Sequence, residues 1–184
     1  MSVRALVLAG DGINCESETA EAFRLAGFEA DVRHINDLVL ERTSLDELSN
    51  KYKALALPGG FSFGDDLTSG KVLALKIQYS LKWDLSQYAK RGGLVIGICN
   101  GFQALIRLGA FGRDVSITHN ASGKFIDRWI KVSPASTKCV WLKGVGTIDL
   151  PIRHGEGRII FRPGNRNEVF GKLERQGMNC LKYE

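Results

Sequence analysis

The sequence predicts an α/β protein with a doubly wound, mostly parallel sheet flanked by helices and with an antiparallel strand extension. Two observations lead to this fold class. From Val3 to Leu108, short and continuous apolar runs alternate with segments of helical spacing, which is typical of parallel strands joined by helical crossovers. Beyond Arg113 the apolar runs follow one another with few helical segments between them, which indicates antiparallel strands.

The first strand is predicted at Val3–Ala9, an apolar run that ends at Gly10-Asp11-Gly12. A helix should follow over Glu16–Ala26, because apolar residues recur there at helical spacing and acidic residues occupy the first turn. Gly27 stands where a left-handed residue commonly ends a helix.

The rest of the first half continues this alternation. In order, the sequence predicts a strand at Phe28–Ile35, a short helix at Asp46–Lys51, a strand at Ala54–Leu57, a mostly helical segment at Val72–Tyr88, a strand at Leu94–Ile98 and a helix at Asn100–Leu108. In the second half, strands are predicted at Phe125–Val132, Cys139–Leu142, Arg158–Phe161 and Met178–Glu184. In such sheets a functional site is expected at the C-terminal ends of the parallel strands.

Length and composition fit one globular domain over residues 1–184, with 44% hydrophobic residues for its core. The net charge is +5, from 25 Lys and Arg against 20 Asp and Glu, and the basic residues are spread along the chain. This distribution argues against nucleic-acid binding. No apolar run approaches the roughly 18 residues that cross a bilayer, so no membrane association is expected.

The four cysteines lie far apart and form no C-x-x-C pair, which favours reduced thiols and a cytoplasmic location. Cys139 and Cys180 fall in apolar runs and are expected in the core, whereas Cys15 falls in a turn. No zinc-type cysteine and histidine spacing and no phosphate-binding glycine loop occurs, so neither a metal nor a nucleotide cofactor is expected in this chain.

The strongest chemical signal is Gly97-Ile98-Cys99-Asn100-Gly101, between a predicted strand and a predicted helix. A nucleophile in this setting sits on a sharp turn, where flanking glycines avoid collisions of the backbone. The start of the helix is expected to lower the pKa of the Cys99 thiol. The competing interpretation is a small buried cysteine beside a helix, with two incidental glycines.

A second signal, Pro58-Gly59-Gly60-Phe61, follows the Ala54–Leu57 strand. Consecutive glycines can turn backbone N–H groups into a shared cavity, as in an oxyanion hole, although Pro-Gly-Gly also forms ordinary tight turns. Paired with Cys99, this turn predicts an oxyanion hole from the N–H of Asn100 and an N–H of Gly59 or Gly60.

These motifs, with three others, resemble a known family: the glutaminase subunits of phosphoribosylformylglycinamidine synthase. Those subunits are class I (triad-type) glutamine amidotransferases of purine biosynthesis, with a flavodoxin-like sheet. The matching segments are Asn14-Cys15-Glu16, Pro58 to Asp65 (PGGFSFGD), Gly97 to Gln103 (GICNGFQ), Asn120 to Gly123 (NASG) and His154 to Arg158 (HGEGR). The resemblance runs from Val3 to Glu184, and GICNGFQ together with GGFSFGD separates this family from related cysteine hydrolases.

The resemblance implies that Cys99 attacks the side-chain amide of glutamine, releasing ammonia and leaving a glutamyl thioester that water hydrolyses to glutamate. Gly60 and Asn100 match the oxyanion positions, and Gly59, Phe61 and Gln103 match the glutamine pocket. Partners are implied as well: a large synthase subunit that uses ATP and Mg to amidate formylglycinamide ribonucleotide, and in many bacteria a small third subunit.

One departure concerns the triad. The family completes it with a His and a Glu in a His-Pro-Glu segment, which this sequence does not contain. Of its histidines, His34 closes a predicted strand and His119 falls in a predicted loop. His154, with Glu156 and Arg158, is expected to shape the site or a partner face rather than to transfer protons.

This departure has two interpretations. Either the domain as given lacks its C-terminal part, which the apolar character of its last residues favours, or the chain is a pseudo-glutaminase that binds the same synthase without hydrolysing glutamine.

Overall fold

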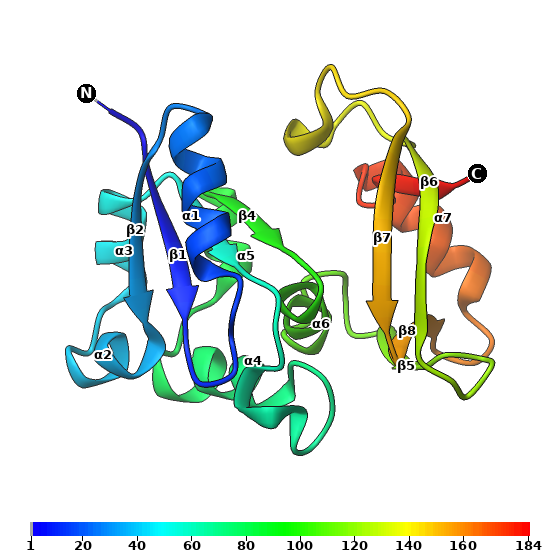
Figure 1. Cartoon of the computed structure of the whole chain (residues 1–184), viewed down its shortest axis with the longest axis horizontal. Helices are drawn as coiled ribbons and strands as arrows, with labels where there is room; N and C mark the ends of the chain where they lie inside the picture. Colours follow the sequence, from blue (N-terminus) through cyan, green and yellow to red (C-terminus); the bar gives the residue numbers. More distant parts are fainter. Residues whose placement is uncertain (1) are drawn as a thin grey trace. The chain divides into compact units, whose positions relative to one another are not determined.

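The computed structural model describes residues 2–184, and the chain forms two compact units, Met1–Ala110 and Phe111–Glu184. Figure 1 shows the first unit as a sheet with flanking helices, and the second as strand pairs with one longer helix. The α/β class, the mostly parallel sheet and the antiparallel extension are therefore confirmed. The expectation of one domain over residues 1–184 stays a prediction.

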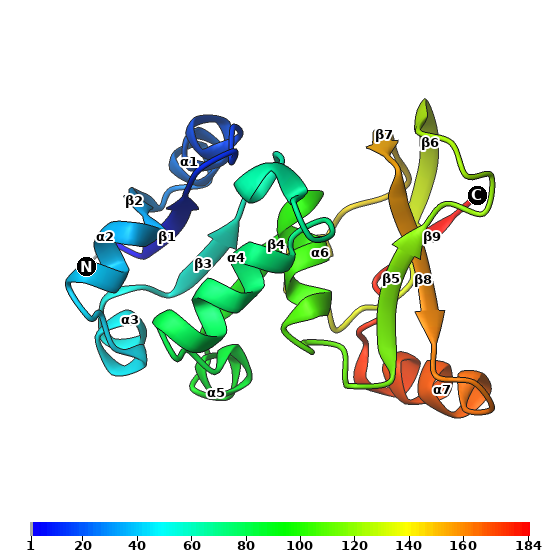
Figure 2. The ribbon, with the colours of Figure 1, turned by 90° about the horizontal axis from the view of Figure 1, so that it is seen from below.

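The first unit is built on a four-stranded parallel sheet in the order β2-β1-β3-β4. Its strands are β1 (Arg4–Ala9), β2 (Glu29–His34), β3 (Ala54–Leu57) and β4 (Leu94–Gly97). Its α-helices are α1 (Glu16–Leu25), α2 (Ile35–Leu40), α3 (Leu45–Lys51), α4 (Lys71–Leu75), α5 (Leu85–Lys90) and α6 (Asn100–Arg107). Figure 2 shows α1 on one side of the sheet and α3 and α5 on the other, as right-handed crossovers require.

The core of the first unit lies on both faces of the two central strands. Residues Ala5 to Leu8 of β1 and all four residues of β3 are completely buried, which explains why these strands are apolar without alternation. Tyr88 of α5 is also buried, and its hydroxyl donates to the carbonyl oxygen of Tyr52 at 2.9 Å.

The prediction of a mostly helical segment at Val72–Tyr88 is confirmed, with a break inside it: α4 continues into a π-helical turn (Lys76–Ser80), and the chain then breaks before α5. The break has a local cause, since Lys82 is left-handed (φ 56°) and the Asp84 side chain caps α5 by accepting from the N–H groups of Ser86 and Gln87. The strand predicted at Phe28–Ile35 extends one residue too far at its end, because Ile35 begins α2, which the His34 side chain caps.

The second unit contains two antiparallel sheets. In one, β5 (Val115–His119) pairs with β8 (Glu156–Phe161), and in the other, β6 (Ile126–Pro134) pairs with β7 (Ile148–His154) and β9 (Leu181–Tyr183). One α-helix, α7 (Arg166–Gln176), ends at the left-handed Gly177.

Several expectations for the second unit need correction. Cys139–Leu142 is not a strand, because Val140–Leu142 forms a short 3-10 helix. His119 ends β5 instead of lying in a loop. Cys139 and Cys180 are half-buried rather than core residues, since the segments that carry them lie outside the buried sheet faces.

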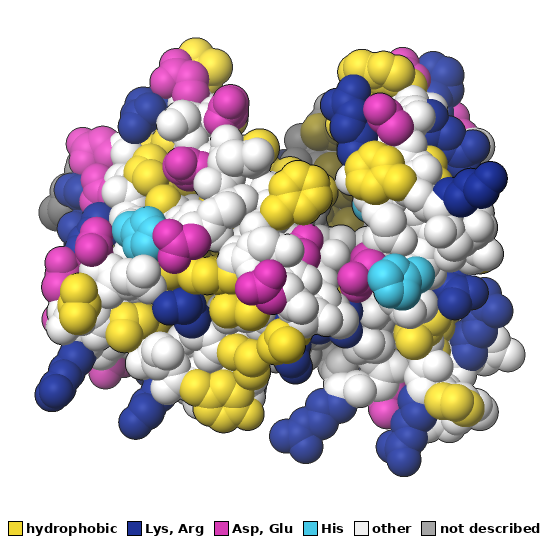
Figure 3. Space-filling view, turned by 60° about the horizontal axis from the view of Figure 1, so that its bottom comes forward, with side chains coloured by type: hydrophobic (Ala, Val, Ile, Leu, Met, Phe, Trp, Pro, Cys, Tyr) yellow, Lys and Arg dark blue, Asp and Glu magenta, His cyan; other side chains and the backbone are white. Residues whose placement is uncertain are grey.

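On the face shown in Figure 3, basic and acidic side chains are both visible, with apolar side chains among them. Within residues 2–184, no helix is long and apolar enough to cross a membrane.

Candidate active site

Cys99 lies on a sharp turn between β4 and α6. Its backbone has φ 51° and ψ −109°, a left-handed conformation that residues with a side chain rarely adopt. The flanking glycines make the turn possible: a side chain on Gly101 would overlap the carbonyl oxygen of Leu57, and one on Gly97 would begin 2.6 Å from Leu105 Cδ1. Cys99 is exposed, so the interpretation as a small buried cysteine is wrong.

The turn after β3 lies directly beside Cys99. Leu57 pairs with Gly97 in the sheet, and the N–H of Ile98 donates to the carbonyl oxygen of Leu57 at 3.0 Å. A side chain on Gly59 would begin 3.4 Å from Cys99 Cβ. The ends of two neighbouring parallel strands thus bring the two predicted motifs together.

Gly60 has φ 145°, and a loop after β1 holds the backbone on either side of it. The N–H of Asn14 donates to the carbonyl oxygen of Gly59 at 3.3 Å, and the N–H of Phe61 donates to that of Gly12 at 2.7 Å. A side chain on Gly60 would begin 2.5 Å from the Gly12 carbonyl oxygen, so only glycine fits. Within residues 2–184 the Gly60 N–H makes no intramolecular hydrogen bond.

The electrostatics of Cys99 differ from the expectation. Desolvation by the surrounding protein raises the pKa of the thiol, the N–H of Asn100 lowers it by hydrogen bonding, and the carboxylate of Asp65 raises it. The net direction is upward, so the predicted lowering of the pKa is wrong. Desolvation and the neighbouring Asp65 carboxylate together outweigh the one backbone donor at the start of α6.

The other predicted pocket residues divide into exposed and buried ones. Phe61 is 60% exposed, next to Gly60. Gln103 is 7% exposed, one turn into α6, and its Oε1 accepts from Asn100 Nδ2 at 3.1 Å. The Oε1 atom of Gln103 therefore already accepts a hydrogen bond from Asn100.

Two polar residues near the site were not singled out from the sequence. Ser62 is completely buried, and its Oγ donates to Asn100 Oδ1 at 2.5 Å. Asp65 Oδ1 accepts from Asn100 Nδ2 at 2.9 Å. The signal that could have found them is their position: both are polar residues in the glycine-rich and aromatic segment that follows a buried strand.

Cys15 also lies close to this turn. Its Sγ is 3.8 Å from the point where a side chain on Gly59 would begin. Burial raises the pKa of the Cys15 thiol, and the nearby Glu18, Cys99 and Glu16 raise it further. Cys15 is thus a neutral neighbour of the site, half-buried at the start of α1.

The residues of the HGEGR segment belong to the second unit. His154 Nδ1 and Asn120 Oδ1 are 2.9 Å apart, and Asn120 Nδ2 donates to the carbonyl oxygen of His154 at 2.8 Å. Burial lowers the pKa of His154. Glu156 pairs with His119 between β8 and β5. The structure therefore joins the NASG and HGEGR segments within this unit.

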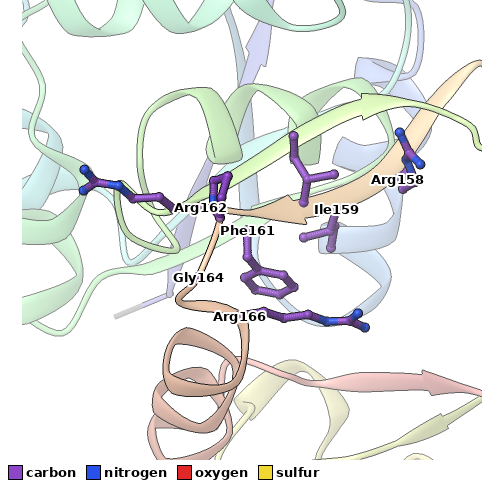
Figure 4. Close-up of a pocket in the computed structure, with 8 residues that line it drawn as sticks. Arg158, Ile159, Phe161, Arg162, Gly164 and Arg166 are labelled. Atoms are coloured by element: carbon purple, nitrogen blue, oxygen red, sulfur yellow. The ribbon is translucent and has the colours of Figure 1, made fainter.

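Arg158 lies at the edge of a shallow pocket around the end of β8 and the start of α7. Figure 4 shows the arginine side chains around it pointing outward from the ribbon. The pocket is lined by Arg158, Ile159, Ile160, Phe161, Arg162, Pro163, Gly164 and Arg166.

A left-handed cysteine between a parallel strand and a helix, beside a glycine turn, is the arrangement of cysteine amidohydrolases on α/β sheets. In agreement, residues 2–184 match the sequence model of the CobB/CobQ-like glutamine amidotransferase domain. The chain belongs to this family of glutamine amidotransferases.

Relatives of higher similarity carry a more specific name, phosphoribosylformylglycinamidine synthase subunit PurQ. The protein of Dehalococcoides mccartyi is 41% identical over 179 residues, covering 93% of this chain and 67% of that protein. One from Methanococcus maripaludis is 40% identical over 163 residues, covering 84% of this chain and 58% of that protein. The chain thus spans 58% to 67% of the length of these two curated relatives.

Solved structures agree with the fold. The structure of PurLQS from Thermotoga maritima has 33% sequence identity and a TM-score of 0.71, covering 89% of this chain and 72% of that chain. A glutamine amidotransferase from the same organism, at 18% identity and a TM-score of 0.56, covers 89% of this chain and 64% of that chain and shows the same fold.

Proposed function

We propose that this protein hydrolyses glutamine to glutamate and ammonia, with Cys99 as the nucleophile. The observation that carries the proposal is the backbone of Cys99, whose left-handed turn at the end of β4 presents an exposed thiol beside the glycine turn after β3. The family to which the chain belongs supports the amidotransferase class.

In the proposed reaction, the Cys99 thiolate attacks the side-chain amide carbon of glutamine, and the carbonyl oxygen becomes an oxyanion. The N–H groups of Asn100 and Gly60 would donate to this oxyanion. The C–N bond then breaks, and the nitrogen leaves as ammonia after gaining a proton. Water hydrolyses the resulting glutamyl thioester, which returns the thiol and releases glutamate.

The reaction also needs a base, because the pKa of the Cys99 thiol is raised. His34, the histidine of the first unit, already accepts from the N–H of Asn36 as the cap of α2. The family resemblance assigns the base to the histidine of a His-Pro-Glu segment, which the 184 residues do not contain. We therefore assign the base to none of the residues around Cys99.

We further propose that the ammonia passes to a large synthase subunit, with a small third subunit in the assembly, as the names PurQ and PurLQS of the relatives suggest. On that partner, ATP and Mg would drive the conversion of formylglycinamide ribonucleotide to formylglycinamidine ribonucleotide. Purine biosynthesis and four unpaired thiols support a cytoplasmic location.

A glutamine analogue with a diazo-ketone group tests this function directly. Such a reagent should add covalently to Cys99, as seen by mass spectrometry of the digested protein, and excess glutamine should slow the addition. Cys99→Ser should abolish the adduct, whereas the matched Cys15→Ser variant should keep it. An unlabelled Cys99 beside a freely labelled Cys15 would favour the alternative, a pseudo-glutaminase that only binds the synthase.

A further inference from the structure

The side chain of Asn100 joins α6 to the loop that follows the glycine turn, although the proposed reaction uses only its backbone N–H. We propose that this side chain is a positioning residue: it holds the loop from Phe61 to Asp66, and through it the Gly59-Gly60 turn that lies beside Cys99. This inference rests on the proposed glutaminase function and adds a residue that sets its geometry.

The two ends of the Asn100 amide have complementary partners. Its Oδ1 accepts from the N–H of Ser62 at 3.1 Å and from Ser62 Oγ at 2.5 Å. Its Nδ2 donates to Asp65 Oδ1 at 2.9 Å and to Gln103 Oε1 at 3.1 Å. Two donors therefore face the carbonyl end and two acceptors face the amino end, which fixes the orientation of the amide.

Because these hydrogen bonds are buried, losing one of them is costly. Asn100 is 1% exposed and Ser62 is fully buried, so water cannot replace a lost partner. Aspartate at position 100 would have nearly the same shape, but it would turn an acceptor toward Asp65 and Gln103. The network therefore selects asparagine by its hydrogen bonds rather than by its size.

The loop that Asn100 holds has an unusual backbone. Phe63, Gly64 and Asp65 are successive left-handed residues, with φ of 54°, 67° and 53°, and side-chain-bearing residues rarely adopt this conformation without outside support. Asp65 Oδ1 also accepts from the N–H of Gly70 at 3.0 Å. The contact of Asp65 with Asn100 thus links the loop to both α6 and the start of α4.

These contacts bear on the reaction through the oxyanion hole. The backbone of Asn100 would donate one of its N–H groups, and the loop held by the Asn100 side chain begins directly after Gly60, which would donate the other. Without the side-chain amide, the Cys99 thiol would stay accessible while the two donors lost their relative placement. Misplacement of catalytic donors by about 1 Å typically costs on the order of 100-fold in rate.

The test compares Asn100→Asp with Asn50→Asp, which makes the same chemical change at an exposed site of α3. Glutaminase kcat and KM are measured on the full chain together with its synthase subunits, and iodoacetamide alkylation of Cys99 is measured in parallel. Asn100→Asp should lower kcat about 100-fold with Cys99 alkylation within about 3-fold of the wild type, and Asn50→Asp should change neither.

Ser62→Ala provides a second variant that removes only the hydroxyl donor. Loss of one hydrogen bond worth about 1 kcal/mol corresponds to roughly a 5-fold lower kcat. The double variant with Asn100→Asp and Ser62→Ala should lose less kcat than the product of the two single losses, because both changes act on the same contact. If Asn100→Asp does not fold, Ser62→Ala alone decides by the same two readouts.

Unchanged kcat in both variants would overturn the inference, as would a parallel loss of kcat and Cys99 alkylation, which marks a merely structural role. A wild-type complex without glutaminase activity or analogue adduct would instead overturn the proposed function itself. The two failures are therefore distinguishable.

Discussion

Cys99 combines an exposed position with a pKa that its surroundings raise rather than lower. Desolvation contributes most to this shift, and Asp65 adds to it. Because the thiolate is the nucleophile, a raised pKa leaves less of it at neutral pH. Attack on an amide therefore calls for a base that accepts the thiol proton.

This raised pKa predicts the pH dependence of alkylation. Because the thiolate is the reactive form, the iodoacetamide rate at Cys99 should rise with pH to a midpoint above the value of about 8.5 of a free cysteine. Asp65→Asn should move the midpoint down, since a negative neighbour is removed. Rates are measured by mass spectrometry in the Cys15→Ser background, and a midpoint at or below that of free cysteine would contradict the prediction.

The surroundings of Asp31 lead to a prediction about the pH dependence of stability. Burial alone would raise its pKa, but hydrogen bonds from Tyr52 and Arg4, both 2.7 Å, and the charges of Arg4 and Lys51 lower it. A carboxylate with a lowered pKa stabilises the fold above its unfolded pKa of about 3.9 and loses this contribution as pH falls through the folded pKa.

Asp31→Asn should therefore lower the free energy of unfolding by about 1 kcal/mol at pH 7, and the difference should shrink as pH falls below about 4. Urea unfolding at several pH values measures it. Asp46→Asn is the matched control, because Asp46 pairs with Arg91 at an exposed site. A loss that does not vary with pH would argue against the charge of Asp31 as its cause.

At the scale of elements, the contact between α6 and β3 is the tightest feature of the site. Gly101→Ala should lower the free energy of unfolding by about 1 to 3 kcal/mol, because the new methyl group would overlap the Leu57 carbonyl oxygen. Gly146→Ala serves as the control, since a side chain there meets no atom within 4 Å. Thermal or urea unfolding measures both, and equal stability of the two variants would contradict this packing.

The elements predicted correctly are those whose signals are local. Continuous burial explains why β1 and β3 were found, and Gly97 with Gly101 marked the turn at Cys99. The helix α7 was missed because its sequence, RNEVFGKLERQ, is mostly polar, has only three large apolar residues and buries none of its residues. Breaks such as the one before Asp84 depend on side-chain caps and left-handed residues, which periodicity does not register.

The candidate site was predictable in its backbone but not in its polar network. Gly60 was predicted because a glycine pair at the end of a strand indicates a backbone turn. Cys99 was predicted because a glycine-flanked cysteine between a strand and a helix indicates a nucleophile. The pKa of Cys99 was misjudged, because a helix start is visible in the sequence whereas the approach of Asp65 from another loop is not. Likewise, the partners of Asn100 depend on a tertiary contact over 35 to 38 residues of chain.

At the scale of the molecule, the two units differ in how much apolar surface they bury. Most buried hydrophobic residues among residues 2–184 belong to the first unit, and the second contributes Val115, Ile117 and Val132. Large apolar side chains of the second unit, such as Trp129 at 68%, stay exposed.

This difference predicts unequal local stability. Amide hydrogens of β1 and β3 should exchange with solvent at least about 100-fold more slowly than those of β6 and β7, because opening the buried sheet exposes far more apolar surface. Hydrogen exchange followed by mass spectrometry resolves these segments. Equal protection in the two units would show that the second unit has a stability that its buried core does not explain.

The pairing of Leu57 with Gly97 has a consequence for how the protein can change. The nucleophile and the glycine turn owe their spacing to the alignment of β3 and β4, so slipping one strand by two residues would separate them by about 7 Å. Insertions within either strand should abolish the site, whereas lengthening the connection between α4 and α5 should leave the spacing intact. Engineered changes of length should therefore be tolerated in the connections and not in the strands.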